Sequence, residues 1–437
     1  MPEAIDLLIE PRWLIPVEPH GSVLEGHAVA VSDGRILDVL PASDGGRYMP
    51  ASHVRLPNHA LIPGLVNLHT HAAMALLRGI ADDLPLMEWL KTRIWPAEAK
   101  HVSPAFVRDG TLLACAEMLR GGITCFSDMY FFPEAAAEAA GRIGMRAMLG
   151  MVVIEFPTAY AADADDYLSK GLAARDRLRG NPLLSFCMAP HAPYTVADKT
   201  FERIATLAAQ LDLPIHIHLH ETRGEIEESL QRHGARPIDR LNRLGLLGPG
   251  LIGVHAVHLE EREIALLAES GCAVAHCPTS NMKLASGVAP IAKLVKSGMQ
   301  IGLGTDGAAS NNRLDLFQEM RHAGLLAKVS SGDAAILDAH ELLRMATLNG
   351  AAALGLERNI GSIVVGKAAD LCAVRLDAIE TLPCFNPVSH LVYAAGREHV
   401  SHVWVGGILQ CENGIVRGAD DDRLLDSIKM WQNKLIV

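Results

Sequence analysis

Short apolar runs of strand length alternate with amphipathic stretches between about residues 58 and 365. This alternation is typical of a parallel sheet whose strands are joined by helices. Segment 197–212 is predicted to be such a helix, because Phe201, Ile204 and Ala208 recur at helical spacing. The predicted strands are 61–68, 123–130, 146–153, 183–190, 214–221, 251–257, 272–278 and 300–307. Eight strands in this arrangement predict a (β/α)₈ TIM-type barrel.

The two ends of the chain have a different pattern. Segments 27–40 and 402–416 alternate apolar and polar residues around Asp-Gly or Asn-Gly turns, which is typical of β-hairpins. We therefore expect a second, smaller β-sandwich domain, formed by residues 1–57 and 366–437 and including a terminal helix from residue 423. The barrel domain is expected to span 58–365, and 437 residues are enough for two such cores.

The connection from about residue 72 to 122 is unusually long for the link after a first strand. Connections of this length inside a compact domain are usually functional. We expect this segment to help cover an active site.

Composition excludes several classes of protein. The formal net charge of −11 and the lack of a Lys/Arg block argue against nucleic acid as a partner. A mean hydropathy of +0.19 argues against an integral membrane protein. The eight cysteines show no CxxC spacing and the N-terminal segment is acidic, so a cytoplasmic protein without an export signal is expected. Apolar barrel faces leave room for a homo-oligomer.

Histidines are concentrated at two predicted strands. His69 and His71 end the first strand, and a period of two residues places both rings on one face. His216, His218 and His220 alternate along the fifth strand and are expected to share one of its faces, where buried unpaired imidazoles would be costly. At least one of these three is expected to bind a metal, whereas a His-x-His pair alone could also be structural.

Two further strands carry polar groups to the same rim. His255 and His258 end the sixth strand, and Asp306 ends the eighth in a Gly-Thr-Asp-Gly sequence. Asp306 alone could equally be a turn residue or a helix cap. Because the carboxyl ends of all barrel strands meet at one face, the histidines and Asp306 together predict a metal site there.

Imidazole and carboxylate ligands suit Zn²⁺, with Fe²⁺ as the main rival. The third and fourth strands contain no lysine that could bridge two metals, so one ion is predicted. A bound divalent ion makes hydroxide available near neutral pH, which indicates hydrolysis. Glu221 follows the fifth strand and is a candidate proton shuttle, although a glutamate there could also simply start a helix.

The sequences HTH, HLHE, GVHAVHL and GTDG, in this order, resemble those of the amidohydrolase superfamily. PLMEWLKTRIWPAEAK, MAPHAPYTV and HCPTSNMKLASGVAPI are similar to its 5′-methylthioadenosine/S-adenosylhomocysteine deaminase branch. The resemblance implies a nucleoside substrate. It also implies that Glu98 binds ribose hydroxyls and that His191 contacts the nucleoside. The metal ligands it implies are His69, His71, His218 and Asp306.

The predicted reaction is hydrolytic deamination at C6 of an adenine nucleoside. Asp306 is expected to accept the water proton, His255 to orient the nucleophile, and Glu221 to protonate the ring nitrogen and contact the substrate. Residues 149–161 contain no arginine to pair with a homocysteine carboxylate, so methylthioadenosine is favoured over S-adenosylhomocysteine, with adenosine also considered. Met87, Trp89 and Met151 are candidates for an apolar tail pocket, or else core residues.

Three alternatives stay open at this stage. The same rim could deaminate guanine or dechlorinate a triazine, and more remotely the chain could be a non-catalytic nucleoside-binding protein. The sequence lacks an HExxH protease motif and a PCxxC deaminase motif. His276, in the seventh strand, is interpreted as structural.

Overall fold

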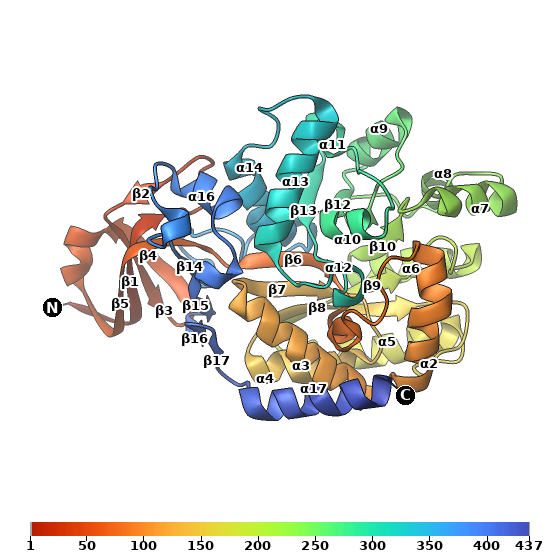
Figure 1. Cartoon of the computed structure of the whole chain (residues 1–437), viewed down its shortest axis with the longest axis horizontal. Helices are drawn as coiled ribbons and strands as arrows, with labels where there is room; N and C mark the ends of the chain where they lie inside the picture. Colours follow the sequence, from red (N-terminus) through yellow and green to blue (C-terminus); the bar gives the residue numbers. More distant parts are fainter. Residues whose placement is uncertain (1, 437) are drawn as a thin grey trace.

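The computed structural model describes residues 2–436 and contains two sheets, which lie side by side in Figure 1. Eight parallel strands in sequential order form the barrel sheet. They are β6 (Leu65–Thr70), β7 (Ile123–Asp128), β8 (Arg146–Val153), β9 (Leu184–Pro190), β10 (Ile215–Leu219), β11 (Leu251–His255), β12 (Ala273–His276) and β13 (Gln300–Leu303). The predicted (β/α)₈ barrel is confirmed.

One predicted strand boundary is wrong. The apolar run from residue 61 belongs at first to β5 (Tyr48–Pro63) of the other sheet, and the barrel strand begins only at Leu65. Gly64 lies between the two strands. A Cβ at this position would lie 2.2 Å from Thr124 Oγ1 on β7, so the close packing here requires a glycine. Apolarity alone could not reveal this crossing between sheets, since both sides of Gly64 are buried.

Polar side chains join the first barrel strand to the last. Thr305 N donates to Asn67 Oδ1 at 3.0 Å, and Asn67 Nδ2 donates to Thr305 Oγ1 at 2.8 Å. Asp306 N donates to the His69 carbonyl at 3.0 Å. These bonds place Asp306 beside His69 and His71.

Helices surround the barrel, as the amphipathic segments predicted. The predicted helix 197–212 is α6 (Asp198–Leu211), with Phe201 and Ile204 fully buried. The others along the barrel are α3 (Pro104–Arg120), α4 (Pro133–Ile143), α5 (Ala164–Leu178), α7 (Arg223–His233), α8 (Pro237–Arg243), α9 (Glu261–Glu269), α10 (Pro278–Lys283), α11 (Ile291–Lys296), α12 (Ala308–Asn311), α13 (Leu316–Ser331), α14 (Ala339–Arg344), the π-helix η4 (Met345–Asn349) and α15 (Gly350–Ala353).

The long connection after β6 folds over the carboxyl ends of the strands. It contains the 3₁₀-helix η2 (Ala72–Leu77), α1 (Leu86–Trp89), the π-helix η3 (Leu90–Ile94) and α2 (Trp95–His101). Residues of all four elements line the cavity described below, so the prediction that this segment covers the site is confirmed. We call residues 72–101 the lid.

Both ends of the chain contribute to the second sheet, a nine-stranded mixed sheet. Its strands are β1 (Glu3–Leu14), β2 (Leu24–Glu25), β3 (His27–Ser32), β4 (Arg35–Pro41), β5, β14 (Leu371–Arg375), β15 (Val400–Val405), β16 (Ile408–Glu412) and β17 (Ile415–Val416). The predicted hairpins are β3–β4 and β15–β17. Short helices η1 (Ala42–Arg47), η5 (Ile379–Thr381), α16 (Pro387–Tyr393) and η6 (Arg397–His399) connect the strands. The predicted domain boundaries, at residues 57/58 and 365/366, stay a prediction.

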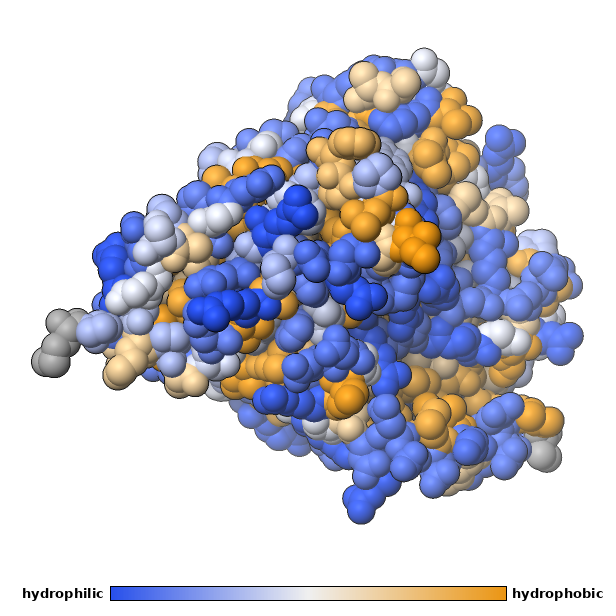
Figure 2. All heavy atoms as spheres, turned by 60° about the vertical axis from the view of Figure 1, so that its left-hand side comes forward, coloured by the Kyte–Doolittle hydropathy of each residue, from blue (hydrophilic) through white to orange (hydrophobic). Residues whose placement is uncertain are grey.

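The terminal helix α17 (Asp421–Leu435) runs beneath α3 and α4 in Figure 1. Trp431 packs edge-on against Phe106 of α3, and its indole Nε1 donates to Asp109 at 2.9 Å. Among residues 2–436, no helix is long and apolar enough to cross a membrane. The face shown in Figure 2 carries its hydrophobic residues in separate patches among hydrophilic ones.

Candidate active site

Three imidazoles and a carboxylate meet at the carboxyl end of the barrel. His69 Nε2 and His71 Nε2 each lie 3.3 Å from Asp306 Oδ1. The ring centroid of His218 lies 5.0 Å from that of His69. The ligand atoms of His69, His71 and Asp306 lie within 4.8 Å of one another, as do those of His69, His218 and His255. The structure thus brings together all four predicted ligands, with His255 beside them.

The chemistry of this group fits a divalent metal. His69 is completely buried, yet its Nε2 forms no hydrogen bond with any of the described residues. An unpartnered ring nitrogen is costly to bury unless a ligand takes its lone pair. Imidazole nitrogens and a carboxylate oxygen are ligands that zinc accepts.

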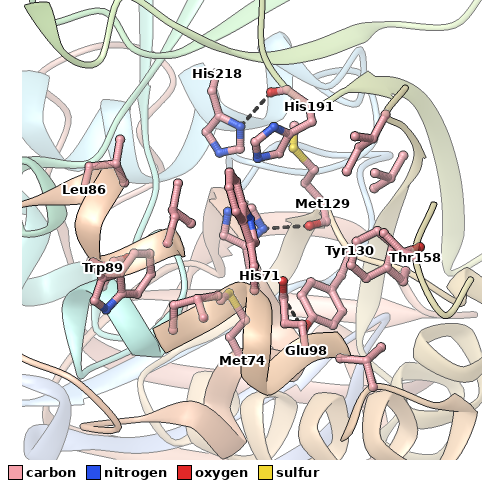
Figure 3. A pocket seen from close by; sticks show the side chains of 18 of the residues that line it. His71, Met74, Leu86, Trp89, Glu98, Met129, Tyr130, Thr158, His191 and His218 are labelled. Atoms are coloured by element: carbon pink, nitrogen blue, oxygen red, sulfur yellow. Dashed lines mark hydrogen bonds between the residues drawn. The ribbon is translucent and has the colours of Figure 1, made fainter. Parts of the chain in front are cut away.

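Backbone carbonyls orient two of the histidines. His71 Nδ1 lies 2.7 Å from the Met129 carbonyl, and His218 Nδ1 lies 2.7 Å from the His191 carbonyl. A carbonyl only accepts, so Nδ1 must carry the proton in both rings. The lone pairs at Nε2 are then free to bind a metal. Figure 3 shows both contacts as dashed lines.

Asp306 is held from both sides. Its Oδ2 accepts from Ser280 Oγ at 2.6 Å and from Ser310 Oγ at 2.7 Å, and its Oδ1 accepts from Gly307 N at 2.7 Å. Burial acts to raise the pKa of this carboxyl, but His69 and His71 hold it well below its usual range. The alternative that Asp306 caps a helix is wrong, because Gly307 is the N-cap of α12.

Glu221 lies at the same rim and is buried. Its Oε2 is 3.7 Å from His255 Nε2, and its Oε1 accepts from Ser286 Oγ at 3.3 Å. Burial raises the pKa of Glu221, while the neighbouring His255 lowers it. Thr222 caps α7, so Glu221 precedes that helix and is not its first residue. A glutamate with a raised pKa can deliver a proton near neutral pH.

His220 does not share the face of His216 and His218, so that expectation is wrong. Its φ of 53° lies in the left-handed region and ends the alternation of the strand. Its Nδ1 contacts the His258 carbonyl at 3.0 Å, and its Nε2 accepts from Ile238 N at 3.3 Å. His220 therefore fixes the loop after β10.

Glu98 and His191 lie at the cavity wall. Tyr130 OH donates to Glu98 Oε1 at 2.7 Å, and both residues appear beside His71 in Figure 3. Burial raises the pKa of Glu98 to about 7, opposed by Tyr130 and His71. His191 Nδ1 contacts Thr195 Oγ1 at 3.0 Å, and burial lowers the pKa of His191 to about 3. His191 is therefore neutral.

A cavity of about 430 Å³ extends from the cluster of His71, His218 and Asp306 beneath the lid. Glu98, His191, Glu221 and Asp306 line it, and its remaining wall is mainly apolar. Among the described residues, no lysine or arginine lines this cavity. The residues of its apolar part include Leu86, Trp89, Ile94, Trp95, Val102, Phe131, Val152, Ile154, Phe156 and Pro157.

Only part of the predicted tail pocket is correct. Trp89 lines the cavity, but Met87 and Met151 do not. Met151 lies on the other face of β8 from Val152, and a Cβ on Gly171 of α5 would lie 2.9 Å from Met151 Cβ. Successive strand residues point to opposite faces, so Val152 reaches the cavity and Met151 packs against the helix layer.

Several polar residues of the site were not predicted. Asn281 Oδ1 lies 2.8 Å from His255 Nδ1, and Glu225 accepts from the backbone N of His220 and of Glu221 at 2.9 and 2.8 Å. Glu225 could have been found, because it is an acidic residue only four positions after Glu221, in the first turn of α7. Ser280, Ser310 and Asn281 lie on short helices whose sequences give no such signal. His276 is buried and is not among the residues that could hold a metal.

A family model described as "Amidohydrolase family" matches residues 60–409. The chain therefore belongs to the amidohydrolase family and is a metal-dependent hydrolase. It is 47% identical over 432 residues, 99% of this chain and 98% of the relative, to a 5-methylthioadenosine/S-adenosylhomocysteine deaminase of Teredinibacter turnerae.

Two solved structures show how widely this architecture is shared. An adenosine deaminase from Xanthomonas campestris with bound zinc superposes with a TM-score of 0.98 at 50% identity, over 100% of this chain and 99% of the other. An atrazine chlorohydrolase from Arthrobacter aurescens TC1 complexed with zinc has a TM-score of 0.90 at 25% identity, over 97% and 99%. The resemblance to the amidohydrolase superfamily, noted from short motifs, is thus confirmed.

Proposed function

We propose that this protein removes the C6 amino group of an adenine nucleoside by hydrolysis, with 5′-methylthioadenosine preferred over S-adenosylhomocysteine. The observation that carries this proposal is a single cavity with three kinds of wall. One wall is the His69, His71, His218 and Asp306 cluster, another is Glu98 with Tyr130, and the third is apolar and uncharged. The names of the deaminase relatives support the same reaction.

The metal is proposed to be one zinc ion per chain, held by His69, His71, His218 and Asp306. Bound there, it supplies Lewis acidity that lowers the pKa of water. Zinc in the similar adenosine deaminase structure supports this choice over iron.

The chain's own residues are proposed to move the protons. Two serine hydroxyls hold the carboxylate of Asp306 in a fixed position. From this position Asp306 accepts a proton from the attacking water. His255, fixed by Asn281, orients the water and stabilises the developing oxyanion at C6. Glu221 protonates the ring nitrogen. Asp306 then passes the proton it took from water to the C6 amino group, which leaves as ammonia, while the proton of the C6 hydroxyl returns to Glu221 and the inosine analogue is formed.

Glu98 is proposed to accept hydrogen bonds from the ribose hydroxyls, and His191 to contact the nucleoside as a neutral ring. The 5′ substituent then lies against the apolar wall. A homocysteine tail would bring a carboxylate without a cationic partner to this wall, which costs binding energy. A methylthio group carries no such charge.

The protein is further proposed to work in the cytoplasm on a small-molecule nucleoside, without nucleic acid or membrane partners and as a homo-oligomer. All eight cysteines are free thiols, which suits a reducing compartment. The exposed Ile379 and Phe385 offer apolar surface for contacts between subunits.

Ammonia release by the zinc-loaded protein tests the proposal. Methylthioadenosine, adenosine, S-adenosylhomocysteine, guanine and melamine would be compared at equal concentration, together with metal analysis. We expect the highest kcat/KM for methylthioadenosine. Turnover of guanine or melamine without turnover of methylthioadenosine would instead indicate that this protein is a guanine or triazine hydrolase. Zinc binding without any turnover would favour a nucleoside-binding protein.

A further inference from the structure

A second layer of polar residues lies behind His69, outside the cavity. His216 is on β10, two residues before His218, and is completely buried. Its Nε2 lies 3.1 Å from His69 Nδ1, and its Nδ1 lies 3.2 Å from Ser127 Oγ on β7. Ser127 is also completely buried. The reaction described above does not use either residue.

His69 differs from His71 and His218 in what orients it. Those two rings donate to backbone carbonyls, which cannot donate in return. His69 Nδ1 faces another imidazole, which can either accept or donate. The geometry thus allows two directions of hydrogen bonding along the row from His69 to Ser127.

In the first direction, His69 Nδ1 donates to His216 Nε2, and His216 Nδ1 donates to Ser127 Oγ. His69 Nε2 then presents its lone pair to the rim. In the second direction, Ser127 donates to His216, which donates to His69 Nδ1, so His69 Nε2 carries the hydrogen. A ring nitrogen that carries a hydrogen cannot bind a metal.

We propose that His216 is a positioning residue for the metal site: supported by Ser127, it accepts from His69 Nδ1 and thereby keeps His69 Nε2 free to bind the metal. His216 does not touch substrate or metal in this arrangement. This proposal rests on the metal assignment above but not on the identity of the substrate. Residues that orient metal ligands in this way typically change metal affinity 10- to 100-fold when replaced.

The test compares zinc dissociation constants, measured by competition with a coloured chelator. We expect His216→Leu to raise the constant about 10- to 100-fold, because His69 Nδ1 loses its acceptor. His216→Gln supplies an amide oxygen as acceptor and should recover much of this loss. His276→Leu is the matched control, since it removes another buried barrel imidazole, on β12, and should change the constant less than threefold.

Ser127→Ala covers the case in which His216→Leu does not fold. It leaves His216 in place without its partner, and we expect the zinc constant to rise several-fold, while Ser127→Thr keeps the hydroxyl and stays near the wild type. Unchanged zinc affinity in folded His216→Leu, or in Ser127→Ala when the former does not fold, would overturn the proposal. Equal weakening by His276→Leu would overturn it as well.

The two proposals can fail separately. Wild-type protein that binds zinc but does not release ammonia would contradict the proposed deamination and leave the role of His216 measurable. Wild-type protein that does not bind zinc would overturn the role of His216 directly.

Discussion

Glu221 and Glu225 are two buried glutamates four positions apart, and their carboxylates have different hydrogen-bond partners. Both are buried, and burial raises the pKa of each. Glu225 accepts backbone hydrogen bonds from residues 220 and 221, so its carboxylate holds the loop. The side chain of Glu221 accepts one long hydrogen bond, from Ser286, lies 3.7 Å from His255 Nε2 and faces the cavity. The carboxylate of Glu221 thus stays available for the proposed proton transfer, because Glu225 holds the backbone of Glu221.

Glu221→Gln is expected to lower kcat about 10²- to 10⁴-fold, because an amide cannot donate the proton that the ring nitrogen needs. The zinc content should stay at the wild-type value, since Glu221 is not a proposed ligand. Steady-state ammonia release and metal analysis measure both quantities. Glu227→Gln, on the exposed side of α7, is the control. Retention of more than a tenth of the wild-type kcat would contradict the shuttle role.

The pKa of Glu98, raised to about 7 by burial, predicts a pH dependence. The carboxylate is ionised above this pH and would, in the proposed role, accept from the ribose hydroxyls, whereas protonation below it removes an acceptor. We expect kcat/KM to fall as pH decreases through about 7. Glu98→Gln should lack this limb and have a kcat/KM at pH 8 lower by about 10- to 100-fold.

Tyr130→Phe provides a check on the same assignment. The Tyr130 hydroxyl lowers the pKa of Glu98 by donating to it, so its removal should move the limb to higher pH. A limb that stays in place in both Glu98→Gln and Tyr130→Phe would assign the ionisation to another group.

The sequence allowed the rim residues to be predicted where a strand carried them. His69 and His218 lie near the carboxyl ends of β6 and β10, and His71 and Asp306 follow β6 and β13. The topology of a barrel brings these strand ends together. Ser127, His216 and Asn281 could not be given roles in this way, because their roles depend on contacts between elements. A buried histidine on a strand can bind a metal itself or can orient another histidine that binds it. Which of the two is possible depends on the side chains that its ring nitrogens face, and the sequence does not give these contacts.

At the level of elements, the position of the lid could be predicted from the sequence, but its helices and the residues that line the cavity could not. Its length predicted a cover, and the structure places Leu86, Trp89 and Ile94 on the cavity wall. Lys283 at the end of α10 holds the lid, since its Nζ lies 2.5 Å from Asp82 and also contacts Asn312. The same helix carries Ser280, which holds Asp306.

Lys283→Ala is expected to raise KM about 2- to 5-fold with little change in kcat, because a partly exposed ion pair contributes about 0.2 to 1 kcal/mol. Initial rates over a range of methylthioadenosine concentrations measure this. Lys293→Ala, which removes an exposed ion pair with Glu261, is the control. A fall in kcat at constant KM would instead indicate that Lys283 acts through the position of Ser280.

For the whole molecule, a buried ion pair joins the barrel to the mixed sheet. Arg146 begins β8, and its Nε and Nη2 donate to Asp370 at 2.6 and 3.1 Å. Asp370 precedes β14 and also accepts from Gly406 N at 2.8 Å. The hairpin patterns predicted the sheet but not this pairing, because residues 224 positions apart share no local signal.

Asp370→Asn tests how strongly this pair couples the two sheets. Arg146 would keep its charge in a buried position without a carboxylate, so we expect the free energy of unfolding to fall by about 3 to 5 kcal/mol. Asp377→Asn, in the exposed pair with Arg375, should cost about 1 kcal/mol or less. Urea unfolding of the zinc-loaded proteins, followed by circular dichroism, measures both changes.

The double variant Arg146→Met, Asp370→Leu should lose less unfolding free energy than Asp370→Asn alone, because no charge is left unpaired. If the double variant is instead the least stable, the two sheets depend on the hydrogen bonds of this pair, including that from Gly406, and its charges matter less.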